Sequence, residues 1–223
     1  MSVKISIILT TLLICSATAQ VTFAQSSNMP LDADQIRLQG DSFAEKEDYV
    51  KAAEYYQRLV DNGNYEPDDL FILSNYYLLV AGTEGLNAMT KANAIAKAQK
   101  YIEEVDKLVP GNVKIVNCKA KVARFREGDN PNGAALAAYN ELLNILDKTE
   151  NKAKYARYYK YAYSYLATYY FGKGDRAKAA NYFQKWLEYD PDNEQLRNYV
   201  ISIVGDSGTV NLEKSDEFNF EDF

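Results

Sequence analysis

Apolar side chains recur along most of this chain at intervals of three and four residues, which is the spacing of one face of an α-helix. No segment shows the sustained alternation of apolar and polar residues that is typical of a β-strand. The clearest helical stretch, residues 163–191, pairs two such patterns across a Gly-Asp turn. It reads Tyr163-x-x-Leu166-Ala167-x-x-Tyr170, then Gly174-Asp175, then Ala179-x-x-x-Phe183, then Pro191. The pattern predicts an all-α chain.

The same phrase occurs three more times. The copies read Ile36-x-x-Gln39-Gly40-x-x-Phe43 with Ala52-x-x-x-Tyr56, Leu70-x-x-Leu73-Ser74-x-x-Tyr77 with Ala98-x-x-x-Ile102, and Val116-x-x-Lys119-Ala120-x-x-Ala123 with Ala135-x-x-x-Tyr139. Each copy places a small residue on each of two helices, where a larger side chain would push the helices apart. One copy is compatible with an ordinary helical bundle, whereas four copies favour a repeat.

The distance between the two small residues indicates where the repeats differ. It is 12 residues from Gly40 to Ala52 and from Ala167 to Ala179, and 24 residues in the second copy. We therefore expect an insertion in the turn around residues 82–85, and a shorter one at residues 128–133, because turns tolerate added residues best. The second helix of the second copy, about residues 88–109, is expected to be longer than usual and begins with an alanine-rich stretch.

The repeated phrase resembles the signature of the tetratricopeptide repeat (TPR). The resemblance implies a right-handed superhelical solenoid of about four helix-turn-helix repeats, near residues 33–66, 67–111, 112–149 and 152–192. Residues 193–204 then form a capping helix. The fourth copy starts early, since helical character begins at Lys152, and residues 152–171 carry eight tyrosines among basic residues. These tyrosines either pack on both sides of a long helix or form an aromatic and basic ledge.

The first 24 residues have the layout of a secretory signal peptide. Lys4 precedes an apolar stretch from Ile5 to Ala17, and small-residue cleavage sites follow at residues 17–19 and 22–24. The stretch is short for a membrane span, which disfavours a retained anchor. Ile14 disfavours a lipoprotein linked through Cys15. We expect an exported, periplasmic or envelope-associated protein without a transmembrane span in the mature chain, with a linker at residues 25–32.

Composition argues against several functions. Removal of Lys4 with the signal peptide takes the formal net charge from −6 to −7, which disfavours a general nucleic-acid binder. The chain has no His, and we find no metal-ligand cluster, Gly-rich phosphate loop or nucleophile motif. Neighbouring acids such as Glu103 and Glu104 point to different sides of a helix. We therefore predict no enzyme and no cofactor, and we expect the lone Cys118 to be a buried apolar residue.

The resemblance to TPR proteins also implies that the first helices line a concave groove for a protein or peptide. The candidate groove residues are Arg37, Asp41, Phe71, Asn75, Leu78, Asn117, Lys121, Arg124, Ser164, Tyr165 and Thr168. Some members of the family hold a peptide carboxylate in a clamp of Lys, Asn and Arg. Here Arg37 fits that clamp, but Asp41 and Cys118 do not, so the clamp is not predicted. The alternative for each residue is a solvated or core side chain with no ligand.

Two functions follow from this fold. The first is an exported adaptor whose groove, with a basic centre and aromatic walls, binds an extended acidic or aromatic segment. The second is a structural subunit of a cell-envelope assembly or secretion complex that uses its outer surface, which a large apolar patch outside the groove would favour. Residues 205–223 form an acidic tail that we expect to be disordered. A further hypothesis docks this tail in the groove of its own or a neighbouring molecule. The oligomeric state stays open.

Overall fold

The computed structural model describes residues 31–128 and 132–204, so the predicted signal peptide and acidic tail lie outside the described residues. The described part is all-helical, without a strand. Its elements are α1 (Ala33–Ala44), α2 (Tyr49–Asp61), α3 (Pro67–Gly82), α4 (Ala88–Leu108), α5 (Val113–Glu127), α6 (Leu136–Leu146), the 3-10 helix η1 (Ala153–Tyr155), α7 (Ala156–Gly172), α8 (Arg176–Tyr189) and α9 (Glu194–Val204).

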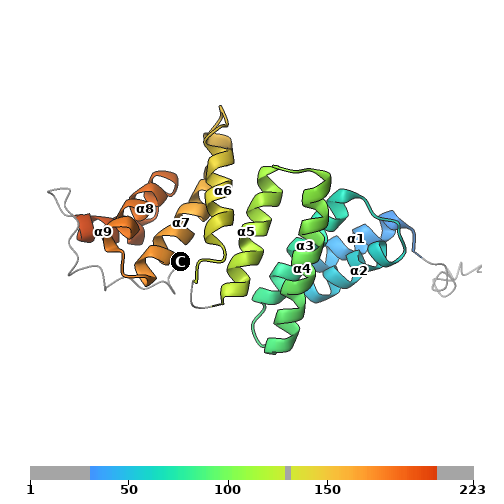
Figure 1. Cartoon of the computed structure of the whole chain (residues 1–223). Coiled ribbons are helices and arrows are strands. Elements are labelled where there is room, and N and C mark those ends of the chain that lie inside the picture. The colour runs from blue at the N-terminus through green and yellow to red at the C-terminus, as the bar shows by residue number, and fades with distance from the viewer. Residues whose placement is uncertain (1–30, 129–131, 205–223) are drawn as a thin grey trace, which may run out of the picture. The chain divides into compact units, whose positions relative to one another are not determined.

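Each helix packs against the next one along the chain, from α1 through to α9, and α3 also packs against α5 (Figure 1). This is the arrangement of a helical solenoid, in which each hairpin contacts its neighbours. The core divides into two clusters of buried side chains. One cluster joins α1 to α4 with one face of α5, through Cys118 and Val122. The other joins α6 to α9 with a second face of α5, through Val116 and Ala120.

Aspartates at corresponding places begin the second helices of the first and last hairpins. Asp48 precedes α2 and accepts a hydrogen bond from the backbone N–H of Lys51, while its other oxygen pairs with the Lys51 ammonium at 2.9 Å. Asp175 makes the same two contacts with Lys178 before α8. Each carboxylate satisfies an N–H group that has no partner within the helix, and its charge suits the helix N-terminus.

The small residues of the repeated phrase lie where the helices approach most closely, as expected. Ser74, Ala120, Ala167, Ala52, Ala98 and Ala135 are fully buried, Ala179 is 2 % exposed, and Gly40 is buried. Ser74 adds a hydrogen bond from its hydroxyl to the carbonyl oxygen of Ala98, at 2.8 Å, which joins α3 to α4.

Gly40 is the tightest of these positions. A Cβ atom added there would lie 2.7 Å from one ring carbon of Tyr56 and 2.8 Å from another. The Tyr56 ring is 1 % exposed and is fixed by a 2.8 Å hydrogen bond from its hydroxyl to Asp41, so it has little room to move.

We therefore expect Gly40→Ala to lower the free energy of unfolding by about 1–3 kcal/mol, although alanine favours helices more than glycine does. Gly172→Ala is the matched control, because Gly172 is also helical and its added Cβ would meet no atom within 4 Å. Urea denaturation followed by circular dichroism measures both. Equal stabilities of the two variants would contradict the packing argument.

The departures from the repeat are confirmed in part. The long second helix of the second hairpin begins at Ala88 as predicted, but the insertion is not confined to the turn, because α3 also continues to Gly82 and only residues 83–87 separate the two helices. In the fourth repeat helical structure begins at Ala153, next to the predicted Lys152, but its first turn is the separate 3-10 helix η1, whose last residue, Tyr155, has non-helical backbone angles before α7. Part of the insertion predicted in the third repeat, residues 129–131, lies outside the described residues.

Candidate functional site

A pocket of about 260 Å³ opens between the first helices of the second, third and fourth hairpins. Its lining residues are Phe71 and Asn75 from α3, Lys114, Asn117 and Lys121 from α5, and Arg157, Tyr158 and Tyr161 from α7. We call it the groove pocket.

Helical spacing brings the α5 residues to one face, because positions 114, 117 and 121 are three and four residues apart. The α5 helix begins at Val113, where the Asn112 side chain accepts a hydrogen bond from the Lys114 N–H, and α7 begins at Ala156, directly before Arg157. Two helix N-termini therefore lie beside the pocket, and their partial positive charges add to those of the side chains.

The groove pocket is positively charged. Lys114, Lys121 and Arg157 line it, no Asp or Glu does, and none of the three forms an ion pair with another described residue. Two of them rest on aromatic rings: the Lys121 ammonium lies 4.7 Å from the centre of the Tyr161 ring, and the Arg157 guanidinium 4.8 Å from that of Tyr158. Arg157 also donates a 2.8 Å hydrogen bond to the Tyr158 hydroxyl oxygen. The rings hold the cations in place without neutralising them.

Asn117 supplies an acceptor that lacks a donor. Asn117 is 6 % exposed, and its Oδ1 atom is buried with no hydrogen-bond partner among the described residues. Nearby, Asn75 donates to the Phe71 carbonyl at 2.8 Å. A buried acceptor without a partner costs about 1–3 kcal/mol. The groove pocket is therefore suited to a ligand that carries a negative charge together with an N–H or O–H donor.

Four of the predicted groove residues meet in this pocket: Phe71, Asn75, Asn117 and Lys121. Arg124 instead lies at the end of α5 and donates to the Gly128 carbonyl oxygen. Ser164 and Thr168 donate their hydroxyls to carbonyls of their own helix, at 3.0 Å and 2.9 Å.

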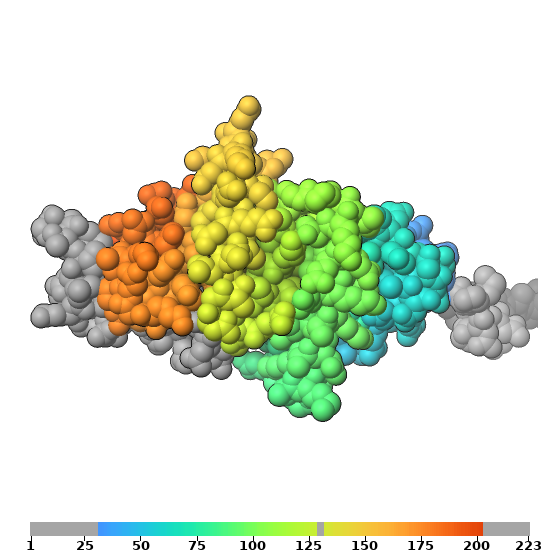
Figure 2. Space-filling view, viewed as in Figure 1, coloured from blue at the N-terminus to red at the C-terminus, as the bar shows by residue number. Residues whose placement is uncertain are grey.

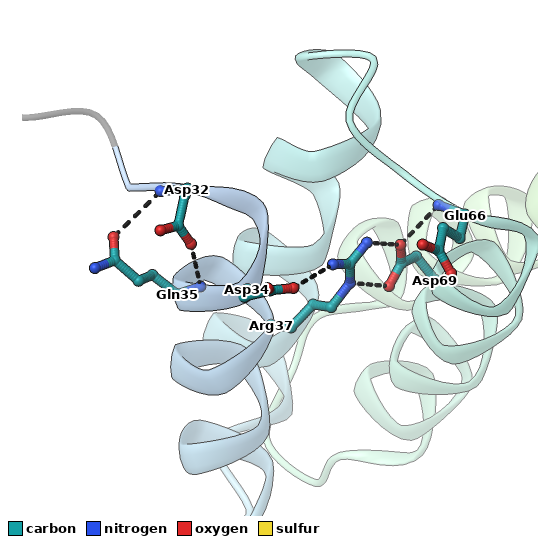
Figure 3. Close-up of polar contacts among 6 residues, drawn as sticks. All are labelled: Asp32, Asp34, Gln35, Arg37, Glu66 and Asp69. Atoms are coloured by element: carbon teal, nitrogen blue, oxygen red, sulfur yellow. Dashed lines mark hydrogen bonds and ion pairs between the residues drawn. The ribbon is translucent and has the colours of Figure 1, made fainter.

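Arg37 and Asp41 already have partners inside the protein. Arg37 donates from Nε and Nη2 to the two oxygens of Asp69, at 2.9 Å and 2.8 Å, and from Nη1 to Asp34 (Figure 3). Burial would raise the pKa of Asp69, but the hydrogen bonds from Arg37 and from the Glu66 N–H outweigh it and lower that pKa overall. Asp41 accepts from the hydroxyls of Tyr56 and Tyr76, at 2.8 Å and 3.0 Å. Arg37 therefore joins α1 to α3, and Asp41 joins α1 to α2 and α3.

Leu78 and Tyr165 do not belong to a groove surface, which corrects the prediction for these two. Each is 4 % exposed and lies in one of the two core clusters. Tyr165 follows Ser164 directly, and adjacent helix residues point about 100° apart, so both cannot line one face. The Tyr165 ring stacks on Tyr139 at 4.6 Å between ring centres, and its hydroxyl donates to Glu127 at 2.8 Å.

Four pocket residues were missing from the predicted set: Lys114, Arg157, Tyr158 and Tyr161. The last three lie in the tyrosine-rich segment, in which four of the eight tyrosines are buried, namely Tyr158, Tyr159, Tyr163 and Tyr165, and Tyr161 is 38 % exposed. The signal for Lys114 was its position one helical turn before Asn117.

Three further findings concern Cys118, metal binding and membrane-spanning helices. Cys118 is 1 % exposed, as expected, and burial raises the pKa of its thiol to about 11. Among residues 31–128 and 132–204, no group of three His, Cys, Asp or Glu side chains is placed to hold a metal ion. No helix of the same residues is both long and apolar enough to cross a membrane.

No protein-family model matches the chain, and no curated protein does. Among solved structures, it is similar to the C-terminal part of a TPR repeat-containing protein from Cytophaga hutchinsonii, with a TM-score of 0.60 and 21 % sequence identity. The similarity covers 74 % of this chain and 58 % of that one, so the chain spans less than two thirds of the structure it matches. The fold of the described residues is thus the TPR-like helical solenoid that the repeated phrase predicts.

Proposed function

We propose that the protein is a non-enzymatic, exported adaptor that binds an extended protein segment along its first helices, with an acidic side chain of that segment in the groove pocket. The observation that carries this proposal is the combination of three cations without acidic partners and one buried acceptor without a donor. The groove pocket is too small for a folded domain, at about 260 Å³, but it admits one or two side chains.

An extended acidic segment supplies both of the missing partners. Its Asp or Glu carboxylate accepts hydrogen bonds from Lys114, Lys121 and Arg157, and charged hydrogen bonds of this kind are among the strongest in proteins. Its backbone N–H donates to Asn117 Oδ1. The rings of Phe71, Tyr158 and Tyr161 provide the apolar walls that favour an aromatic neighbour of the acid.

Binding should depend on the acid and on Lys121. A library of short peptides with one fixed position, occupied by Glu or by Gln, is titrated against the full chain by fluorescence anisotropy. We expect the Glu peptides to bind about tenfold more tightly, and Lys121→Glu to remove this preference because a carboxylate would then face a carboxylate.

Lys148→Glu is the matched control, since it makes the same change of charge at an exposed position outside the pocket. It should leave the preference for Glu unchanged. Equal binding of Glu and Gln peptides, or a Lys121→Glu variant that still prefers Glu, would refute the proposed function.

The second candidate function, a structural subunit that makes permanent contacts through its outer surface, is favoured by one observation. An open cleft with apolar walls lies between α4 and α5, outside the groove pocket. A subunit of this kind would bury that cleft against a partner in a stable complex, whereas the adaptor would exchange its ligands.

A further inference from the structure

An open cleft of about 700 Å³ lies between the N-terminal half of α4 and the end of α5. A smaller pocket of about 340 Å³ adjoins it and shares its residues Ala92, Ile95 and Phe125. We call the two together the α4–α5 cleft. It shares no residue with the groove pocket.

The lengthened second hairpin creates this cleft. The α4 helix has 21 residues and α5 has 15, and α5 stops at Glu127, where Gly128 turns the chain with a positive φ of 65°. Figure 2 shows the tip of the hairpin standing out from its neighbours as a green lobe at the lower edge. Near this tip, Met89 is 75 % exposed, and Phe125 on α5 is 37 % exposed.

The floor of the α4–α5 cleft is apolar and its rim is basic. Alanines of α4, together with Ile95 and Phe125, form the floor, and Lys91, Arg124 and Arg126 stand around it. No Asp or Glu lines either part, and none of the three cations forms an ion pair with a described residue. Such a basic rim in a chain of net charge −6 favours an acidic ligand with apolar side chains.

One segment of this chain has that chemistry. Residues 216–223 read Asp-Glu-Phe-Asn-Phe-Glu-Asp-Phe, so three phenylalanines alternate with four acids. The phenylalanines suit the shallow alanine floor, and the acids suit the three cations. The groove pocket is less suitable, because its volume of about 260 Å³ is too small for three phenyl rings and its lining is largely polar.

The segment can reach the α4–α5 cleft of its own molecule. Eleven residues separate Val204, the end of α9, from Asp216, and an extended chain of that length spans on the order of 36–40 Å. Contacts run from α9 through α8, α7 and α6 to α5. Four helix-to-helix steps of about 8–10 Å cover a similar distance.

We propose that residues 216–223 bind in the α4–α5 cleft of the same chain. The phenylalanines lie on Ala88, Ala92 and Ile95, and the acids pair with Lys91, Arg124 and Arg126. This interaction covers the apolar residues of the α4–α5 cleft and leaves the groove pocket free for another ligand. The inference does not depend on the function of the groove pocket.

A peptide of residues 211–223, labelled with a fluorophore, tests the proposal by anisotropy. The receptor is the full chain in which Phe218, Phe220 and Phe223 are replaced by Ser, so that its own segment no longer competes. We expect binding that the double variant Lys91→Glu and Arg126→Glu weakens about tenfold or more. We expect the unaltered full chain to bind the added peptide at least about fivefold more weakly, because its own segment occupies the cleft.

Three controls make the result specific. Lys121→Glu, in the groove pocket, should leave peptide binding unchanged, and a peptide with Ser in place of Phe should not bind. Circular dichroism verifies that the variants are folded. The proposal is overturned if the charge-reversed variant binds equally well, if Lys121→Glu abolishes binding, or if the unaltered chain binds as tightly as the receptor variant.

Discussion

Between about pH 10 and pH 11 the protein should lose its helical structure in one cooperative transition, because many tyrosines are buried as neutral phenols. Burial is the largest cause that raises the pKa of each of these groups, and it raises that of Tyr163 to about 12. The other buried tyrosines with a raised pKa are Tyr56, Tyr77, Tyr139, Tyr159 and Tyr165.

The sign of the effect follows from linkage. A phenol ionises near pH 10 in the unfolded chain, whereas in the folded chain it stays neutral to a higher pH. Its contribution to stability is therefore fully present below about pH 10 and is lost as the pH rises toward the folded-state pKa. At pH 11 each such group removes on the order of 1 kcal/mol, so several of them together remove an amount comparable with the total stability of a typical domain.

Circular dichroism and phenolate absorbance, recorded together from neutral to alkaline pH, measure this transition. Exposed phenols ionise while the chain is still folded, so the loss of helix should coincide with the later rise in phenolate absorbance, which comes from the buried phenols as the chain unfolds. Tyr163→Phe should move the midpoint to higher pH, and Tyr65→Phe, at a turn residue that is 42 % exposed, should leave it unchanged. Phenolate absorbance that reaches its full value while the helices persist would contradict the prediction.

Glu127→Ala should lower the free energy of unfolding by about 3–6 kcal/mol, since it leaves several buried donors without an acceptor. Glu127 Oε1 accepts hydrogen bonds from the backbone N–H groups of Gly133 and Ala135, both at 2.9 Å. The hydroxyl of Tyr165 donates to the same oxygen at 2.8 Å. One side chain at the end of α5 therefore joins α5 to the residues that begin α6 and to the middle of α7 through hydrogen bonds.

Conservative and remote variants separate this role from a general loss of charge. Glu127→Gln retains one acceptor oxygen and should cost less than half as much as Glu127→Ala. Glu141→Ala, at an exposed position on α6, should change the stability by less than about 0.5 kcal/mol. Urea denaturation gives all three values. A Glu127→Ala variant as stable as Glu141→Ala would show that the three hydrogen bonds contribute nothing.

The repeated phrase predicts the fold well because it reports on close contacts within each hairpin. Gly40, Ser74 and Ala167 are small because two helices pack closely there, and a small residue recurs at the same place in every copy, so the sequence alone reveals these positions. Insertions are harder to place. The alanine-rich stretch before Ala98 indicates a long second helix, because alanine favours helices, but nothing in the sequence shows that α3 also continues to Gly82.

The candidate site is predicted only in part, because the sequence places a residue on a helix but not against a neighbouring helix. Phe71 and Asn75 of α3 and Asn117 and Lys121 of α5 line one pocket. Leu78 is buried in a core cluster, and Arg37 is paired with the Asp69 carboxylate, so neither is free to bind a ligand. Those contacts join residues that are far apart in sequence, so spacing alone does not reveal them.

The α5 helix contributes side chains to both core clusters, so it joins the two halves of the solenoid. Its opposite faces complete the two core clusters, and its remaining sides supply Asn117 and Lys121 to the groove pocket and Arg124 and Phe125 to the α4–α5 cleft. Because one rigid helix completes both core clusters, a change that displaced α5 as a whole would disturb the packing of both halves of the solenoid at once.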